Sequence, residues 1–168
     1  FLHHLATRHA TLAAMTVFVQ GRPFDHAPDL HKRLRAWADG CERVDGFLWL
    51  GFVADTDDAR GRRLFVPWSK NADRRELRMN DFHRFLFGCA GPPLYRFFPG
   101  GQFAVTREVA HRRPAGFYRV AAGLAASFPD GAHCFARLWD RVFLVDGTAA
   151  RIPPGIQTVY FTPVRRLA

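Results

Sequence analysis

The chain has 168 residues, of which 48% are hydrophobic and 17 are phenylalanine, and this composition excludes a disordered protein. Its length predicts a single domain over residues 1–168, with the core in 1–147 and a C-terminal extension in 148–168. The formal charge of +9 at pH 7 favours polyanionic partners such as nucleic acid, nucleotides or anionic lipid headgroups.

The first third of the chain predicts two helices and two strands. Apolar residues at spacings of three and four predict a helix over 2–13, which leads into a strand over 15–20. A second helix over 28–40 begins beside a proline and ends at a glycine. The continuous apolar run over 47–54 is typical of a strand that is covered on both faces, and a polar loop over 55–63 follows it.

The rest of the chain predicts short elements separated by prolines and glycines. After an apolar piece over 64–68, the expected elements are a helix over 80–87, strands over 94–98 and 102–106, helices over 114–128 and 132–145, and a strand over 158–162. Because helices and strands alternate, the sequence predicts an α/β fold that is three layers deep.

A turn with two ionisable residues follows the first predicted strand directly. Asp25 and His26 end the stretch Gln20-Gly21-Arg22-Pro23-Phe24-Asp25-His26. Open α/β sheets bind ligands at the carboxyl ends of their strands, where these two side chains would serve as a metal ligand, a general base or a contact to a sugar hydroxyl. The alternative is a plain loop in which Asp25 bonds its own backbone.

Two aspartates follow the longest apolar run. Asp55 and Asp57 form an Asp-x-Asp pattern that could hold a divalent cation, Mn²⁺ or Mg²⁺, against a pyrophosphate. The adjoining Ala-Arg-Gly-Arg-Arg sequence over 59–63 is equally typical of a solvated loop. Both interpretations stay open at this point.

A glycine pair precedes the predicted strand over 102–106. Gly101 and the glycine before it let the backbone approach a ligand closely, and Gln102 offers both a donor and an acceptor. Arg107, at the far end of this strand, could bind a phosphate or a carboxylate. The alternative is a glycine bulge before an ordinary strand, with Arg107 and Glu108 beginning a helix.

Cysteine and histidine patterns exclude several other kinds of site. The three cysteines are isolated, so they predict neither a disulfide framework nor a zinc ribbon and favour a reducing, cytoplasmic setting. The eight histidines include no pair at the i, i+4 spacing that places two imidazoles on one helix face. No apolar run approaches the length of a membrane span, and no nucleophile or phosphate-loop motif is present.

Five blocks follow one another in a recognisable order. They are Leu2-His3-His4-Leu5, residues 16–26, residues 101–108, Arg113-Pro114-x-x-Phe117-Tyr118 and Leu138-Trp139-x-x-Val142-Phe143. In this order, over about residues 1–145, the chain resembles a domain-of-unknown-function family of fungal and bacterial proteins. Members of that family usually begin earlier, with a strand and an Arg-Glu turn. We therefore expect the domain to be incomplete at its N-terminus.

The family is similar to nucleotide-sugar transferases of the GT-A type, in which a Rossmann-like half binds the nucleotide. The resemblance implies a three-layer, Rossmann-like mixed sheet and a glycosyltransferase-like transferase that uses a nucleotide-linked donor. Gln20-Gly21 stands where such enzymes carry a metal-binding Asp-x-Asp, so a metal-free mechanism and the absence of sugar transfer both stay open. The implied site has Asp25, His26 and Asp140 as catalytic residues and Gln20, Arg22, Gly101, Gln102 and Arg107 as substrate-binding residues.

Two alternative functions stay open beside sugar transfer. One is an enzyme that forms a peptide bond from aminoacyl-tRNA, to which relatives bear a weaker resemblance and which the charge of +9 favours. The other is a non-catalytic domain that binds nucleotides or polyanions. Lys32 and Lys70 are the only lysines among 24 basic residues, so arginine-rich coding bias would also produce this charge.

Overall fold

The computed structural model describes residues 1–63, 75–147 and 152–161, which form a mixed α/β structure. The longer helices are α2 (Leu30–Ala38), α3 (Met79–Phe87) and α5 (Ala115–Ser127). The shorter ones are α1 (Leu2–Thr7), α4 (Arg107–Ala110), α6 (Gly131–Ala136) and α7 (Trp139–Val142), with 3-10 turns η1 (His9–Thr11) and η2 (Pro23–Asp25). Within these ranges, none of the helices combines the length and the apolar character that crossing a membrane requires.

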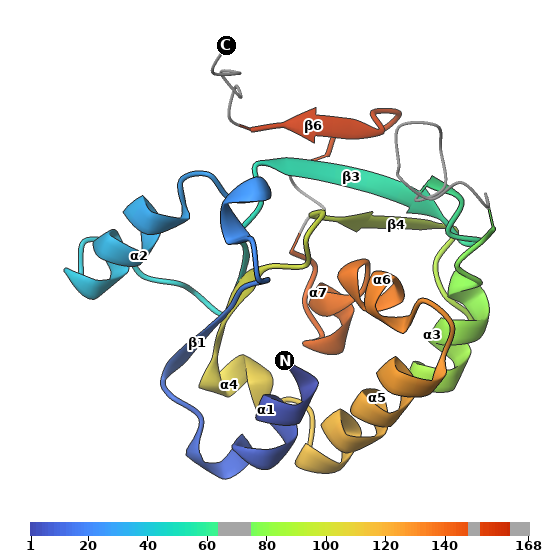
Figure 1. The fold of residues 1–168 in the computed structure, drawn as a ribbon, viewed down its shortest axis with the longest axis horizontal. Coiled ribbons are helices and arrows are strands. Elements are labelled where there is room, and N and C mark those ends of the chain that lie inside the picture. Colours follow the sequence, from blue (N-terminus) through green and yellow to red (C-terminus); the bar gives the residue numbers. More distant parts are fainter. Residues whose placement is uncertain (64–74, 148–151, 162–168) are drawn as a thin grey trace.

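The described strands form two three-stranded antiparallel sheets. The first has the order β1 (Met15–Phe18), β5 (Phe103–Thr106), β2 (Phe47–Trp49), and the second has the order β4 (Leu94–Phe97), β3 (Val53–Asp58), β6 (Thr158–Tyr160). Figure 1 shows the second sheet along one side of the molecule, with α6 and α7 next to β4. The α/β class is thus confirmed. The Rossmann-like mixed sheet is not confirmed, because all pairings among the described strands are antiparallel.

The single strand expected over 47–54 is wrong. The chain ends β2 at Trp49, bends, and begins β3 at Val53. Gly51 lies in the bend against the buried ring of Phe98, and a Cβ atom there would come 2.6 Å from Phe98 Cδ1. The bend therefore requires glycine at position 51, because any side chain there would collide with Phe98.

The prediction of a polar loop over 55–63 is also wrong for residues 55–58, because β3 continues to Asp58. Aspartates are unfavourable in strands, so their presence here needs compensating contacts, which the candidate site below supplies. The helix expected over 132–145 divides into α6 and α7, and the helix expected over 2–13 ends at Thr7 before η1. The apolar piece over 64–68 lies outside the described residues.

Aromatic rings fill the core, as the composition predicts. The ring of Phe103 lies 5.1 Å from that of Phe18, 5.4 Å from that of Phe47 and 4.9 Å from that of Trp139, centroid to centroid. The first sheet thereby packs against α7, while α1 packs on α5 and α5 on α6. This packing fixes α6 beside the second sheet, where the candidate site lies.

Candidate functional site

A cavity of about 440 Å³ is bounded by the turn after β1, strand β3, the end of β4 and helix α6. Its polar lining consists of Gln20, His26, Asp55, Arg63, His133 and Arg137. Segments that are far apart in the sequence thus bring two guanidinium groups, two imidazoles, an amide and a carboxylate to one hollow. Such a set can recognise a small molecule that carries an anionic group.

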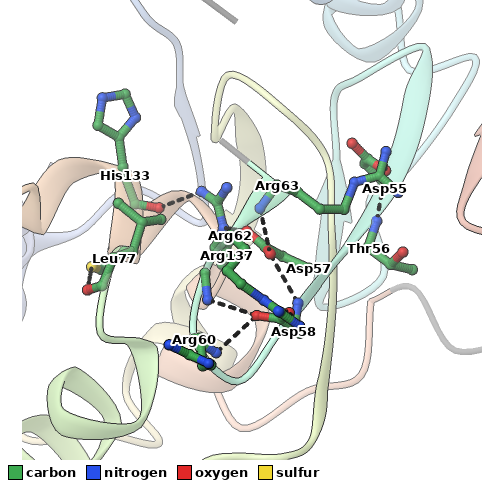
Figure 2. A network of polar contacts seen from close by, with 12 residues as sticks. Asp55, Thr56, Asp57, Asp58, Arg60, Arg62, Arg63, Leu77, His133 and Arg137 are labelled. Atoms are coloured by element: carbon green, nitrogen blue, oxygen red, sulfur yellow. Dashed lines mark hydrogen bonds and ion pairs between the residues drawn. The ribbon is translucent and has the colours of Figure 1, made fainter. Parts of the chain in front are cut away.

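Arg137 reaches the cavity from the end of α6 and binds the central strand of the second sheet. Its Nε donates to Oδ2 of Asp57 at 2.7 Å, and the two side chains are only 4% and 0% exposed (Figure 2). Its Nη1 donates to the carbonyl oxygen of His133 at 2.9 Å, and its guanidinium lies 4.5 Å from the ring centroid of Phe97. These contacts hold the guanidinium in a single orientation.

Arg63 lies in the segment that follows β3, and aspartates of β3 hold it in place. Its Nη2 lies 3.1 Å from Oδ1 of Asp55, and its backbone N–H donates to Oδ1 of Asp57 at 3.0 Å (Figure 2). Oδ1 of Asp55 also accepts from the hydroxyl of Thr158 at 2.8 Å. Because side chains alternate along a strand, Asp55 and Asp57 lie on the same face of β3, and each can orient one arginine.

Asp55 and Asp57, the aspartates predicted as metal ligands, bind guanidinium groups in this structure. No group of three or more histidines, cysteines, aspartates or glutamates in the described part of the chain has the arrangement of a metal site. One carboxylate oxygen of Asp55 and both of Asp57, which are the kind of ligand that Mn²⁺ or Mg²⁺ would need, already accept from Arg63 or Arg137. No step proposed below passes through a metal ion.

The segment that runs from the end of β1 through η2 positions Gln20 and His26. The side chain of Gln102 is buried and bridges the turn: its Nε2 donates to Pro23 O at 2.9 Å, and its Oε1 accepts from Gln20 N at 3.3 Å. The carbonyl oxygen of His26 accepts from Phe52 N at 3.1 Å. Gln102 therefore uses its donor and its acceptor within the protein. It does not line the cavity but holds in place the turn that carries Gln20.

Both imidazoles of the cavity favour the neutral form. Burial lowers the pKa of His26 below its ordinary value, although the nearby Asp25 carboxylate acts in the opposite direction. Burial and the positive charge of Arg137 lower the pKa of His133 in the same way. At neutral pH each imidazole can consequently accept a proton or a hydrogen bond from a ligand.

Gly100 makes room for the His26 ring. A Cβ atom at this position would lie 2.7 Å from two atoms of the imidazole, and the φ angle of +89° also favours glycine. The sequence predicts a close approach of the glycine pair to a ligand, whereas the backbone at Gly100 packs against the side chain of His26. Gly101 lines a neighbouring cavity of about 410 Å³ together with Trp139.

The structure brings some of the predicted site residues together and separates others. Gln20, His26 and Asp55 line the cavity, and Asp57 lies directly behind it. Asp140 lines a different cavity. Three further predicted residues are exposed and line neither of these cavities: Arg22, Asp25 and Arg107. Arg107 begins α4, as the alternative interpretation had it.

Sequence reasoning missed Arg63, His133 and Arg137. Arg63 belongs to a stretch that is typical of a solvated loop, so its sequence gave no signal. In the helix expected over 132–145, Arg137 is spaced four residues from both His133 and Arg141, which places it on the polar face opposite the apolar stripe of Phe135 and Leu138. An arginine on the polar face of a helix is typically solvated, so the sequence held no signal of the buried ion pair with Asp57.

Comparison of the chain with models of known protein families, with curated proteins and with solved structures finds no match. The cavity's chemistry and the resemblance of the sequence blocks are therefore the basis of the functional proposal.

Proposed function

We propose that the chain is a glycosyltransferase-like transferase that binds the phosphates of a nucleotide-linked donor in the cavity of Arg63 and Arg137. The observation that carries the proposal is the placement of these two guanidinium groups, each oriented by an aspartate of β3, beside the neutral imidazole of His26. The GT-A-like fold and the reaction class come from the resemblance of the sequence blocks. The cavity supports them through its capacity to bind an anion.

Both arginines keep donors for a ligand. A guanidinium group has five N–H donors, and it binds phosphate oxygens in pairs. Among the described residues, Nη2 of Arg137 and Nε of Arg63 make no hydrogen bond or ion pair. The other side-chain nitrogens are already bound: those of Arg63 by Asp55, Gln157 and Thr158, and those of Arg137 by Asp57 and the carbonyl oxygen of His133. Binding a phosphate therefore requires little further ordering of these side chains.

The proposed reaction transfers a sugar from a diphosphate to a hydroxyl group. The acceptor oxygen forms a bond to the anomeric carbon while the bond from that carbon to the phosphate oxygen breaks, so the nucleoside diphosphate leaves with the electron pair. Arg63 and Arg137 stabilise the charge that develops on this leaving group. His26 accepts the hydroxyl proton, and Gln20 hydrogen-bonds the sugar or the acceptor.

Ligand binding is tested by thermal shift with UDP, GDP and their sugars, on the wild type, on Arg63→Ala and on Arg62→Ala. Arg62 is the matched control, because it precedes Arg63, is largely exposed, pairs with Asp58 and does not line the cavity. We expect a nucleotide to raise the melting temperature of the wild type and of Arg62→Ala, and Arg63→Ala to lose most of that rise. Equal shifts in the two variants would refute this site.

Catalysis is tested by donor turnover with the nucleotide-sugar that gives the largest shift. His26→Asn keeps a polar side chain of similar size but has no proton-accepting imidazole. We expect it to lower kcat by about a hundredfold, with little change in the KM for the donor. Nucleotide binding without turnover in the wild type would instead support the non-catalytic binding domain.

A further inference from the structure

A second cavity, of about 510 Å³, is lined by helix α3, the segment that precedes α5, helix α7 and the residues that follow α7. It shares no lining residue with the cavity of Arg63 and Arg137. Its polar and charged lining consists of His83, Cys89, Arg113, Asp140, Arg141 and Asp146. The proposed function uses none of these residues.

Asp140 contributes a buried carboxyl group to this cavity. The residue is 5% exposed, and its Oδ1 accepts a hydrogen bond from the backbone N–H of Arg141 at 2.8 Å. Among the described residues, no side chain forms a hydrogen bond or an ion pair with this carboxyl group. Burial of this carboxyl group is unfavourable, and the charge of the neighbouring Arg141 offsets only part of that cost, so a ligand that supplies a cation or a hydrogen-bond donor would relieve it further.

Two arginines provide the opposite charge in the same cavity. The guanidinium of Arg113 lies 4.5 Å from the ring centroid of Phe117 and 5.4 Å from that of Phe87, and its Nε donates to Val142 O at 3.3 Å. Arg113 is thus held by two aromatic rings and a carbonyl group, in contrast to the exposed Arg141. Both guanidinium groups keep further N–H donors for an anionic group.

We propose that this cavity binds a small zwitterionic ligand of the amino-acid class, with its ammonium group at Asp140 and its carboxylate at Arg113 and Arg141. A purely anionic ligand would place its charge near Asp140, and a purely cationic one would face the two arginines, so a ligand with both charges fits the lining best. This inference does not rest on the transferase proposal.

The other ionisable groups of the cavity are compatible with such a ligand. Nδ1 of His83 lies 2.9 Å from the carbonyl oxygen of Cys89 and donates to it, and burial lowers the pKa of His83, so this imidazole adds no charge at neutral pH. Burial, with a smaller contribution from the charge of Asp146, raises the pKa of Asp140 to about 7, although the charge of Arg141 acts in the opposite direction. An ammonium group binds the ionised form, so affinity should rise from pH 6 to pH 8.

The test is isothermal titration calorimetry with the twenty L-amino acids as probes. For each amino acid that binds, the N-acetyl and C-terminal amide forms are titrated as well. We expect at least one free amino acid to bind, with an affinity that rises between pH 6 and pH 8, and both blocked forms to bind about tenfold or more weakly. Absence of binding by all twenty, or equal binding of a blocked form, would overturn the proposal.

Three variants locate the binding. Asp140→Asn and Arg141→Gln should each weaken binding of the same amino acid by about tenfold or more, whereas Asp39→Asn, an exposed carboxylate outside this cavity, should leave it unchanged. Arg141 is exposed, so its variant reports on the ligand even if the buried position proves sensitive. Unchanged affinity in both Asp140→Asn and Arg141→Gln would place the ligand elsewhere.

Discussion

Individual buried charges determine much of the stability of the candidate site. Asp57 and Arg137 are almost completely excluded from water, so each neutralises the other in surroundings where an isolated charge is very unfavourable. By contrast, the pair of Arg78 and Asp81 lies at the surface, where ion pairs contribute little. Removing the carboxylate should therefore have a large effect on stability at Asp57 and a small one at Asp81.

Replacement of Asp57 with asparagine should strongly destabilise the fold. The variant leaves the Arg137 guanidinium buried without its counter-charge, and such losses amount to about 3–5 kcal/mol of unfolding free energy. Asp81→Asn, the exposed control, should change that free energy by less than about 1 kcal/mol. Urea denaturation of both variants measures the difference, and a loss below about 1 kcal/mol for Asp57→Asn would show that the buried pair is dispensable.

Asp140→Asn should stabilise the protein at alkaline pH. Burial raises the pKa of Asp140 to about 7 in the folded state, against an ordinary value of 3.8. Between these values the folded protein holds a proton that the unfolded chain releases, so stability falls as pH rises from about 4 to about 7, by up to about 4 kcal/mol. Asparagine keeps an acceptor for the N–H of Arg141 but cannot ionise.

Melting temperatures of the wild type and of Asp140→Asn at pH 4.5 and pH 8 test this prediction. We expect the variant to melt several degrees above the wild type at pH 8, and the difference to shrink at pH 4.5. A difference that does not depend on pH would show that Asp140 ionises in its ordinary range.

The sequence correctly predicted the helices and strands whose bounds are marked by apolar spacing and by neighbouring glycines or prolines. The helices over 79–87 and 115–127 and the strands over 94–97 and 103–106 agree with the expected segments to within one residue at each end, because apolar spacing and glycine or proline boundaries mark them. The pattern failed at β3, whose aspartates are stabilised by Arg63 and by Arg137 from far along the chain. A local pattern holds no information on such partners.

The candidate site shows the same limit. His26 and Gln20 stand at a strand end, which is a recognisable local signal, and both line the cavity. Their arginine partners come from a loop and from the end of α6. The division between α6 and α7 also places Arg137 at one cavity and Asp140 at another, so the sequence could not show that these two residues belong to separate sites.

Gly51→Ala should disrupt the bend between β2 and β3. The added Cβ would come within 2.6 Å of the buried Phe98 ring, which stacks on Trp49 at 5.8 Å between centroids. We expect a loss of about 1–3 kcal/mol in the free energy of unfolding, as for other overpacked cores. Gly123→Ala is the matched control, because a Cβ there contacts nothing within 4 Å and helix α5 should gain about 0.5–1 kcal/mol. Equal effects in chemical denaturation would contradict this explanation of the bend.

The whole molecule carries a charge of +9, and this charge has consequences that are separate from the cavity. A broad basic surface binds polyanions by releasing counterions, and this binding weakens steeply with salt. A small nucleotide in the cavity depends on a few oriented donors instead. The two kinds of binding can therefore be distinguished by one substitution.

Arg63→Ala should leave binding of bulk tRNA almost unchanged while it removes nucleotide binding. The substitution removes one of 24 basic residues, so the slope of log affinity against log salt should fall by about one at most. Fluorescence anisotropy with labelled tRNA at several salt concentrations measures that slope. Loss of tRNA binding in Arg63→Ala would favour the alternative in which the cavity takes part in aminoacyl-tRNA chemistry.

The central claim is that a nucleotide's phosphates lie beside Arg63, Arg137 and the two imidazoles of the first cavity. NMR titration of the histidine side chains, with and without saturating UDP or GDP, tests this claim most directly. A bound phosphate favours the imidazolium form, so the pKa of His26 and that of His133 should both rise, while that of His83 in the second cavity should not change. Unchanged pKa values at His26 and His133 in the presence of a nucleotide that binds would contradict the account.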